Sequence, residues 1–476
     1  MGAAPIRSRP DEPDRASRRG LALVLLCVAE FVLVLDVSAA NVALPSIAAD
    51  LAMGRAGATW VLTAYVLAFG GLMLLGGRLA DALGRRRVLV TGLTVFALGS
   101  LACGLAPTGA VLLAGRVLQG VGAALASPAA LSSISTAFTG PERDRALGAW
   151  ATIGGVGFVA GILLSGLLTT GPGWRWIFLL NVPVGAVLLV ALPLVLPGDP
   201  ARRRIPVDAA GAVLVTATTA LVVLGLTAAG DAGWTSPATL LPLAGALVAG
   251  AGFVAVERRA ADPLVPPGLL VRRPVLTGTA TMLAASALML SVFFLASLRL
   301  QHLQGYDALG TGLAFLPAAL AVTAGAHAGA RLLGRFGARP VAAAAFGLAA
   351  LGAALLALAP AGAGAWTGVV PGLALTALGL GPAFVVATST ALSHVADREA
   401  GLASGAVNTG HELGGALGVA LVSSIAASSL AGAVATPGGF TAGFTVMAGV
   451  AAVAAVAGPA LLPAGRPSVV GHGHGH

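Results

Sequence analysis

The chain has 476 residues, of which 57% are apolar and 9% charged, and its formal net charge is +9. Ordinary globular proteins carry about 25% charged residues, so this chain has too few charged groups to cover a soluble surface. The composition excludes a soluble fold and predicts an integral membrane protein. All 27 basic residues are Arg. They lie in short segments between apolar runs, which argues against a nucleic-acid partner.

Fourteen apolar stretches follow one another along the chain. A bilayer core about 30 Å thick needs about 20 apolar residues per helix. The stretches lie at 20–44, 57–79, 88–106, 109–135, 146–169, 175–197, 207–229, 238–256, 274–299, 309–333, 340–360, 365–391, 402–429 and 439–463. We therefore predict an all-α integral membrane protein with about 14 transmembrane helices.

The arginines indicate the orientation of these spans. Counting alternate loops from the N-terminus places 23 of the 27 Arg residues on one side. Arg55, Arg175 and Arg299 fall on the other side, and Arg116 lies inside a span. Because basic residues accumulate in cytoplasmic loops, this distribution predicts that both termini are cytoplasmic.

The chain also carries an internal repeat with an offset of 253 residues. This offset brings Arg78 onto Arg331 and Arg86 onto Arg339, and it pairs the Asp-Arg dipeptide at 144–145 with that at 397–398. It spans eight helices, so spans 1–6 resemble spans 9–14, and spans 7 and 8 form an inserted pair. The predicted organisation is a cytoplasmic tail 1–19, a six-helix bundle 20–198, the inserted pair 199–262, a second six-helix bundle 263–463 and a tail 464–476. Transporters built from two halves bind substrate near the midplane between them, so the repeat predicts alternating access.

Four motifs carry a resemblance to a known family. They are GRLADALGRRR at 77–87, LDVSAANVALP at 35–45, RVLQGVGAA at 116–124 and WRWIFLLNVP at 174–183. Together they resemble the signatures of the major facilitator superfamily, and specifically of its 14-spanner drug:proton antiporters. The resemblance implies two pseudo-symmetric six-helix bundles plus an inserted pair. It also implies efflux of amphipathic drugs, antibiotics or related metabolites from the bacterial cytoplasm, with the proton gradient in place of a cofactor. Fourteen spans in two halves can form a complete pathway, so a monomer is the simpler expectation.

One motif departs from the family pattern. The fifth-helix antiporter signature is met by Gly148, Gly157 and Gly161, but Ile162 stands where the family has Pro. Small residues still allow close helix packing, whereas the kink site is lost. Two alternatives to export therefore stay open. One is a proton-coupled importer or facilitator of a specific metabolite, and the other is a membrane sensor or scaffold that transports nothing.

Two ionisable residues inside spans are the main candidates for proton coupling. Charged groups are costly within a bilayer and are functional candidates for that reason. We expect Asp36 to carry protons or a cationic substrate and Arg116 to switch its affinity, with Asn41 and Gln119 as polar neighbours lining the substrate cavity. The alternative is a static structural ion pair.

A second polar group lies in the thirteenth span. Glu412 is a further candidate for proton coupling, and Asn408 and His411 beside it are candidates for the substrate cavity; an interhelical polar contact is the competing interpretation. Glu30 is also a cavity candidate. On an ideal helix it is turned about 240° from Asp36, which favours packing or snorkelling on another surface.

The loop between spans 2 and 3 is predicted to be a conformational latch. Asp81 and Arg85 are spaced i,i+4, and Gly77 and Gly84 permit close approach or a sharp turn; Arg86 completes the latch candidates. The resemblance implies that this loop ties helix 2 to helix 11 at the cytoplasmic face. A solvated loop charge is the alternative. The second copy of the loop has Gly334 in place of the acid.

Overall fold

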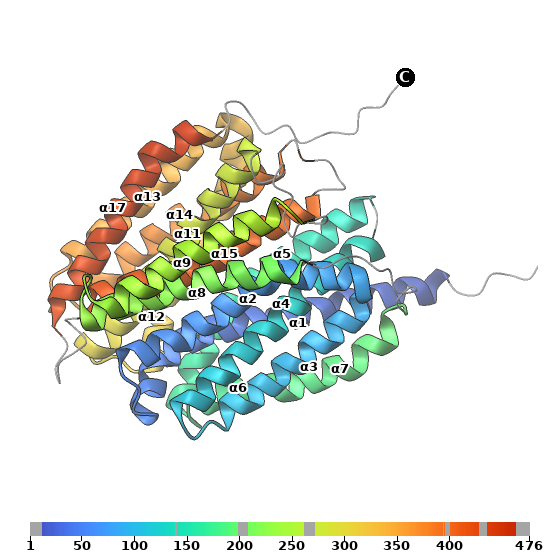
Figure 1. Cartoon of the computed structure of the whole chain (residues 1–476), viewed down its shortest axis with the longest axis horizontal. Helices are drawn as coiled ribbons and strands as arrows, with labels where there is room; N and C mark the ends of the chain where they lie inside the picture. Colours follow the sequence, from blue (N-terminus) through green and yellow to red (C-terminus); the bar gives the residue numbers. More distant parts are fainter. Residues whose placement is uncertain are drawn as a thin grey trace, which may run out of the picture.

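The computed structural model describes residues 12–138, 140–198, 208–260, 272–393, 395, 400–427 and 436–462. Over these residues the chain folds into helices alone, and the axes of most of them are roughly aligned in one bundle (Figure 1). Twelve helices are long and apolar enough to cross a bilayer. Two more, α5 (Gly140–Thr170) and α15 (Ala400–Ile425), coincide with the fifth and thirteenth predicted spans. The prediction of an all-α multi-pass membrane protein is confirmed.

Six spans form the N-terminal half. They are α1 (Glu12–Asp50), α2 (Arg55–Leu83), α3 (Arg85–Gly104), α4 (Gly109–Ala137), α5, and a sixth span divided into α6 (Arg175–Leu179) and α7 (Asn181–Val195). α1 packs along α5, α2 and α3 pack on α4, and α7 packs on α3. α1 begins at Glu12, inside the segment predicted to be a tail. An acidic residue followed by Pro suits a first helical turn, so the helix starts before the apolar run.

The C-terminal half repeats this arrangement. It contains α11 (Arg273–Leu298) with a π-helical end η1 (Arg299–Leu303), α12 (Ala308–Phe336), α13 (Ala338–Leu358), η2 (Ala365–Val369) leading into α14 (Val370–Leu392), α15, and α17 (Pro437–Leu461). α11 packs along α15, α12 and α13 pack on α14, and α17 packs on α13. Gly84 and Gly337, 253 residues apart, end α2 and α12 with φ values of 104° and 84°. The sequence repeat is therefore also a repeat of packing and of turn geometry.

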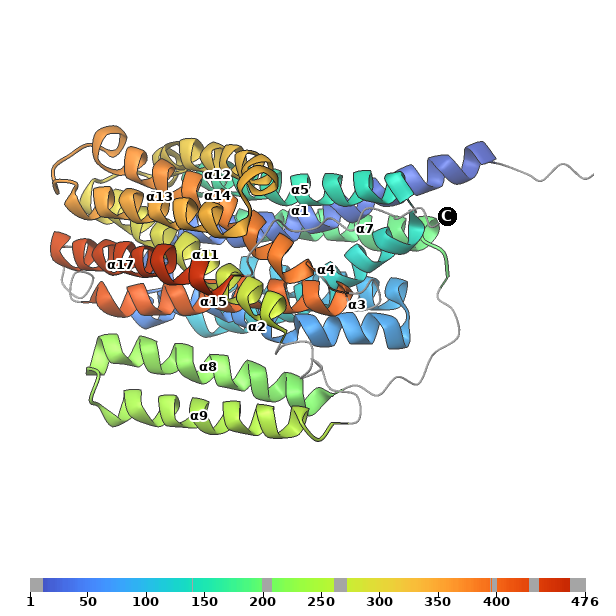
Figure 2. The same ribbon diagram turned by 90° about the horizontal axis from the view of Figure 1, so that it is seen from above.

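The inserted pair lies at one edge of the bundle. It consists of α8 (Ala209–Ala232) and α9 (Pro237–Glu257), which run side by side in Figure 2. α8 packs on α2 and on α15, one helix from each half, whereas α9 packs on α8. The boundaries predicted at 198–199 and 262–263 border or lie in segments outside the described residues, and the tail 464–476 lies outside them entirely. The domain limits therefore remain predictions.

The two halves meet along two seams. α2 lies against α15, and α5 lies against α12. These two contacts are related by the repeat, because α12 is the second copy of α2 and α15 is the second copy of α5. A symmetric pair of seams between two bundles leaves a space between them near the pseudo-twofold axis, which is where the candidate site lies.

The three arginines on the predicted non-cytoplasmic side are all held by the protein. Each donates hydrogen bonds to oxygens of neighbouring segments. The partners are Thr227 and Ser423 for Arg55, Asp50 and Ala106 for Arg175, and Leu356, Ala359 and Pro360 for Arg299. These residues act as ties within the fold, so they do not weaken the one-sided distribution of the remaining arginines.

Candidate transport site

A cavity of about 470 Å³ lies between the two halves. Its walls come from α1, α2, α4, α5, α11, α14 and α15, mostly from the parts of these helices nearer the face at which α1 begins, which is the predicted cytoplasmic face. Three methionines and three phenylalanines form much of its apolar surface. They are Met73, Met282, Met289, Phe69, Phe158 and Phe384. Methionine side chains adapt readily to different ligand shapes, and the volume lies within the usual range for small-molecule sites.

Two carboxylates from opposite halves line this cavity. Glu30 belongs to α1 and Glu412 to α15. Glu412 Oε1 lies 3.1 Å from Nδ1 of His411, whose ring also packs against Phe384. Glu30 Oε2 is buried and has no hydrogen-bond partner. Asn408 lines the same cavity, so the structure brings together four of the residues that the sequence singled out.

The position of Glu30 corrects one expectation. The predicted turn of about 240° from Asp36 suggested packing or snorkelling on another surface. That other side of α1 is the cavity itself, because α1 is enclosed and contacts α2, α4, α5, α7 and α11. Asp36 points toward α4 and α7, and Glu30 points into the cavity. Asp36 and Glu30, on two different sides of α1, are therefore both inside the protein.

Asp36 is the centre of a buried polar network. Its side chain is 1% exposed, and one carboxylate oxygen accepts a hydrogen bond from the Arg116 guanidinium. The other oxygen accepts bonds from Gln119 Nε2 at 2.9 Å and Asn181 Nδ2 at 2.8 Å. Ser100 Oγ in turn lies 2.7 Å from Gln119 Nε2. Three donors directed at one carboxylate form a site suited to its ionised state.

Arg116 is held as tightly as its partner. Its side chain is fully buried, and its Nε donates to the Val61 carbonyl at 2.9 Å. The guanidinium also lies over the Tyr65 ring at 4.4 Å, close enough for a cation–π contact. Nη2 has no hydrogen-bond partner. The predicted pairing of Asp36 with Arg116 and Gln119 is present in the geometry; its role in coupling is not tested by geometry.

A much smaller cavity borders both this network and the large cavity. It has a volume of about 20 Å³, is lined by Ser38, Asn41 and Arg116, and shares Val37 and Met289 with the large cavity. A volume of this size accommodates one water molecule. The side-chain oxygen of Asn41 is buried without a partner. Asn41 therefore faces the small cavity beside Arg116 and is absent from the lining of the large cavity.

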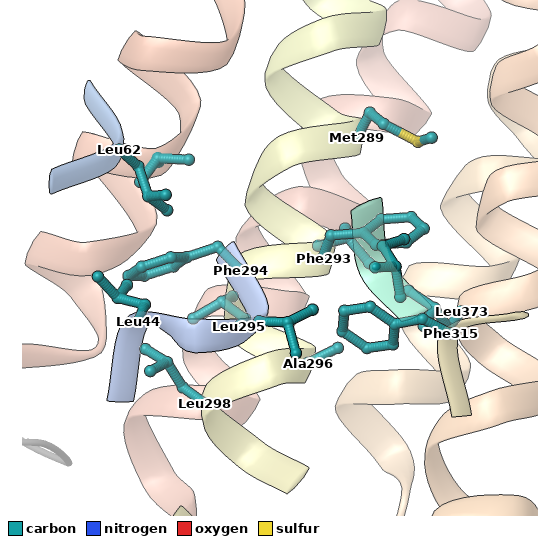
Figure 3. Packing of buried hydrophobic residues seen from close by; sticks show 14 of the residues in the cluster. Leu44, Leu62, Met289, Phe293, Phe294, Leu295, Ala296, Leu298, Phe315 and Leu373 are labelled. Atoms are coloured by element: carbon teal, nitrogen blue, oxygen red, sulfur yellow. The ribbon is translucent and has the colours of Figure 1, made fainter. Parts of the chain in front are cut away.

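Apolar side chains close the cavity on the side away from the predicted cytoplasmic face. We call this group the outer seal; it consists of Leu44, Leu62, Phe293, Phe294, Leu298 and Phe315 (Figure 3). The Phe293 ring packs edge-to-face on Phe315 at 5.0 Å and on Phe158 at 5.7 Å. Phe158 lines the cavity. Because the seal takes residues from both halves, the halves must separate there before the cavity can open to that side.

The predicted latch lies at the opposite end of α2. Asp81 is about half exposed, and its carboxylate is 3.7 Å from Arg85. Gly84 makes the sharp turn into α3, Gly77 faces Pro128 of α4, and Arg86 donates to the Leu196 carbonyl at 3.4 Å. The resemblance placed the partner of α2 on the eleventh span. The C-terminal helix that packs along α2 is instead α15, the thirteenth span, whereas the eleventh, α13, packs on α14 and α17.

The fifth-helix glycines pack α5 against α1. A Cβ on Gly161 would lie 2.5 Å from the Leu35 carbonyl oxygen, and one on Gly157 would lie 3.0 Å from that of Phe31. The surroundings of Gly148 lie outside the described residues. Ile162, in the place of the family proline, packs against Gly312 of α12. α5 therefore packs against α1 of its own half on one side and against α12 of the C-terminal half on the adjacent side.

Several site residues were not selected from the sequence. Asn181 belongs to the sixth-span motif, but the motif alone did not connect it with Asp36. Ser100 and Tyr65, beside the ion pair, and Ser127, which lines the large cavity, carry no signal except their polarity within apolar runs. Polar residues inside predicted spans were the available clue, and only the packing shows which of them converge.

Comparison with known proteins agrees with this architecture. A family model described as Major Facilitator Superfamily matches residues 26–419, most of the chain. The chain belongs to the major facilitator superfamily. The family resemblance inferred from the four motifs is therefore confirmed.

Two curated relatives and one solved structure show how far the similarity extends. The cephamycin export protein CmcT of Amycolatopsis lactamdurans is 40% identical over 413 residues, which cover 86% of this chain and 85% of that protein. The lincomycin resistance protein of Streptomyces lincolnensis is 37% identical over 410 residues, covering 85% and 84%. The crystal structure of the POT family transporter PepTSo has a TM-score of 0.69 at 16% identity, covering 93% of this chain and 97% of that one. At this identity the structural match concerns the fold alone.

Proposed function

We propose that this superfamily member exports amphipathic drugs, antibiotics or related metabolites in exchange for protons. The observation that carries the proposal is the buried Asp36–Arg116 ion pair, with a water-sized cavity between Arg116 and an apolar, carboxylate-bearing chamber between the halves. Relatives named for cephamycin export and lincomycin resistance support efflux of antibiotic-like solutes. The mostly apolar wall favours amphipathic solutes over sugars, which need more polar contacts.

Transport proceeds by alternating access. In the present conformation the outer seal is closed and the cavity lies toward the predicted cytoplasmic face, so substrate enters from the cytoplasm. The halves then turn about the α2–α15 and α5–α12 seams, which separates Leu44 and Leu62 from Phe293 and Phe294. The chamber opens outward and substrate leaves.

Proton coupling acts on the ion pair. In the present conformation the Asp36 carboxylate is paired with Arg116. When the chamber opens outward, a proton from outside binds the Asp36 carboxylate and weakens its attraction to Arg116. Return to the inward-facing state rebuilds the pair and releases that proton to the cytoplasm through the small cavity. One charge moving through 100 mV yields about 2.3 kcal/mol, so one or two protons sustain a useful substrate gradient.

The proposal includes the membrane in which the protein lies, its energy source and its oligomeric state. The protein lies in the bacterial cytoplasmic membrane with both termini in the cytoplasm, and the proton gradient serves in place of a cofactor. Two six-helix halves enclose one complete pathway, so a monomer suffices. The bundle limits 20–198 and 263–463 and the inserted pair 199–262 belong to the same proposal.

Everted vesicles from a host without its own pumps test this function. With an acid interior, substrate should accumulate inside wild-type vesicles, and adding substrate should release protons from them. Asp36→Asn should abolish both, while Asp307→Asn, which changes a carboxylate that caps α12, should leave both intact. Undiminished proton-driven uptake by Asp36→Asn contradicts the coupling scheme. Uptake in the reverse direction would identify an importer, and no proton movement at all would favour a sensor or scaffold.

A further inference from the structure

A proline interrupts the backbone hydrogen bonding of α1 beside the outer seal. In an α-helix the N–H of each residue donates to the carbonyl four residues earlier. Pro45 lies inside α1 and has no N–H, so the carbonyl of Asn41 lacks its usual helical donor. A backbone carbonyl without a donor is costly in an apolar setting. This turn of α1 is therefore suited to accept a hydrogen bond from another helix.

Two side chains of the C-terminal half supply donors to this turn. Ser297 Oγ, on α11, donates to the carbonyl of Asn41 at 3.4 Å. Gln301 Nε2, on η1, donates to the neighbouring carbonyl of Val42 at 3.0 Å and to Ser297 Oγ at 3.0 Å. Both N–H groups of the amide and the O–H group of the serine are thus used. We call Ser297, Gln301 and the two carbonyls the outer clasp.

The outer clasp lies where the two halves meet at the outer seal. Ser297 is 1% exposed and adjoins Leu298 of the seal, and Asn41 lies three residues before Leu44 of the seal (Figure 3). Arg299, two residues after Ser297, donates to carbonyls at and just after the end of α13, so the donor side of the clasp is fixed to the C-terminal half. The acceptors belong to one half and the donors to the other.

We infer that the break at Pro45 makes α1 a docking point for the opposite half and that the outer clasp holds the outward exit closed. Opening that exit separates α1 from α11 and breaks the bonds between them, and water then serves the freed carbonyls. Apolar contacts in the seal are not directional, whereas hydrogen bonds fix the position at which α11 meets α1. This role concerns closure of the exit and holds for either direction of transport.

Spin labels at the outer ends of the two halves measure this opening in the purified full-length protein. Leu105 after α3 and Leu358 of α13 are 65% and 80% exposed, so Leu105→Cys with Leu358→Cys provides the pair in a background without the native cysteines. The measured quantity is the ratio of the longer, open distance to the shorter, closed one. Ser297→Ala leaves the Asn41 carbonyl without a donor and should raise this ratio about fivefold. Gln301→Leu leaves that bond in place and should raise it about threefold.

Two matched variants remove the same groups from nearby positions. Ser291→Ala, six residues earlier in α11, removes a buried hydroxyl that has no hydrogen-bond partner among the described residues. Gln304→Leu removes a donor that bonds within the C-terminal half. Neither should alter the ratio. Pro45→Ala gives the Asn41 carbonyl a donor within α1, so adding Ser297→Ala to it should change the ratio less than twofold.

Two results would overturn the inference. One is a ratio in Ser297→Ala and Gln301→Leu no higher than in the matched variants. The other is an effect of Ser297→Ala that stays undiminished beside Pro45→Ala, because the proline would then not be its basis. If Gln301→Leu fails to fold, Gln301→Glu keeps the shape without the amide donors and should show the same shift. The measurement needs neither substrate nor gradient, so its failure is distinguishable from failure of the proposed export.

Discussion

The two halves share a scaffold but not its buried polar groups. In the N-terminal half, Gly122 of α4 meets Gly92 and Phe96 of α3; in the C-terminal half, Gly379 of α14 meets Ala345 and Ala349 of α13. Arg116, six residues before Gly122, therefore corresponds to Leu373, six residues before Gly379. Leu373 is fully buried in an apolar core.

The first helix of each half shows the same contrast. Gly161 packs on the backbone of Leu35, and Gly414 packs on that of Leu283. Asp36, next to Leu35, thus corresponds to Ala284, next to Leu283. Close packing by small residues is common to both halves, whereas the ion pair exists in one. The comparison indicates that the repeat supplies the moving framework and that Asp36 and Arg116 are a specialisation placed on it.

Replacing the ion pair by its counterparts should have the largest effect. Arg116→Leu leaves Asp36 charged, buried and unpaired, which should lower stability by about 3–5 kcal/mol. The double variant Asp36→Ala with Arg116→Leu copies the C-terminal half and should recover most of that stability, yet neither variant should transport. Thermal unfolding in detergent and vesicle uptake measure both properties. A double variant no more stable than Arg116→Leu would show that the halves differ in more than this pair.

The latch should separate transport from stability. Asp81→Ala should abolish transport while substrate binding stays measurable, because the change affects gating at the protein surface. Its exposed pair with Arg85 contributes about 0–1 kcal/mol, so the unfolding temperature should hardly move. Gly334→Ala, at the acid-free second copy, has open space around it and should leave transport unchanged. Normal export by Asp81→Ala would refute the latch.

The shared scaffold should respond equally in both halves. Gly122→Ala and Gly379→Ala each place a methyl group against backbone atoms of the neighbouring helix, and each should destabilise the protein by about 1–3 kcal/mol. Gly347→Ala on α13, with open space around it, should be neutral or slightly stabilising. Thermal unfolding compares the three. A loss confined to one half would mean that the framework is not truly repeated.

Arg55 should give the smallest effect, a shift between conformations. It joins α2 to Ser423 of α15 and to Thr227 of α8, so it holds the outer end of one seam closed. Arg55→Gln should raise labelling of Asn41→Cys from the outside several-fold, in a background lacking the two native cysteines. Arg175→Gln removes ties within the N-terminal half only. It should not change labelling, and equal labelling in both variants would remove the special role of Arg55.

Local pattern predicted the helices and part of the site. Apolar length located the spans, and the cost of charge in lipid singled out Asp36 and Arg116. What local pattern could not supply is which faces of different helices meet. Asn181 reaches Asp36 only because α7 packs near α1, and Glu30 faces a cavity only because α1 packs among helices of both halves. The eleventh span as partner of α2 followed from the resemblance instead of from local pattern, and the packing places α15 there.

The inserted helix α8 packs on α2 and α15 at once, so it reinforces the α2–α15 seam. A reinforced seam resists displacement more than an unreinforced one. We therefore expect the rocking axis to lie off-centre, nearer α8, and the α5–α12 border to move farther in each transport cycle. The inserted helices, which contribute no residue to the described lining of the cavity, would therefore make the motion of two similar halves asymmetric.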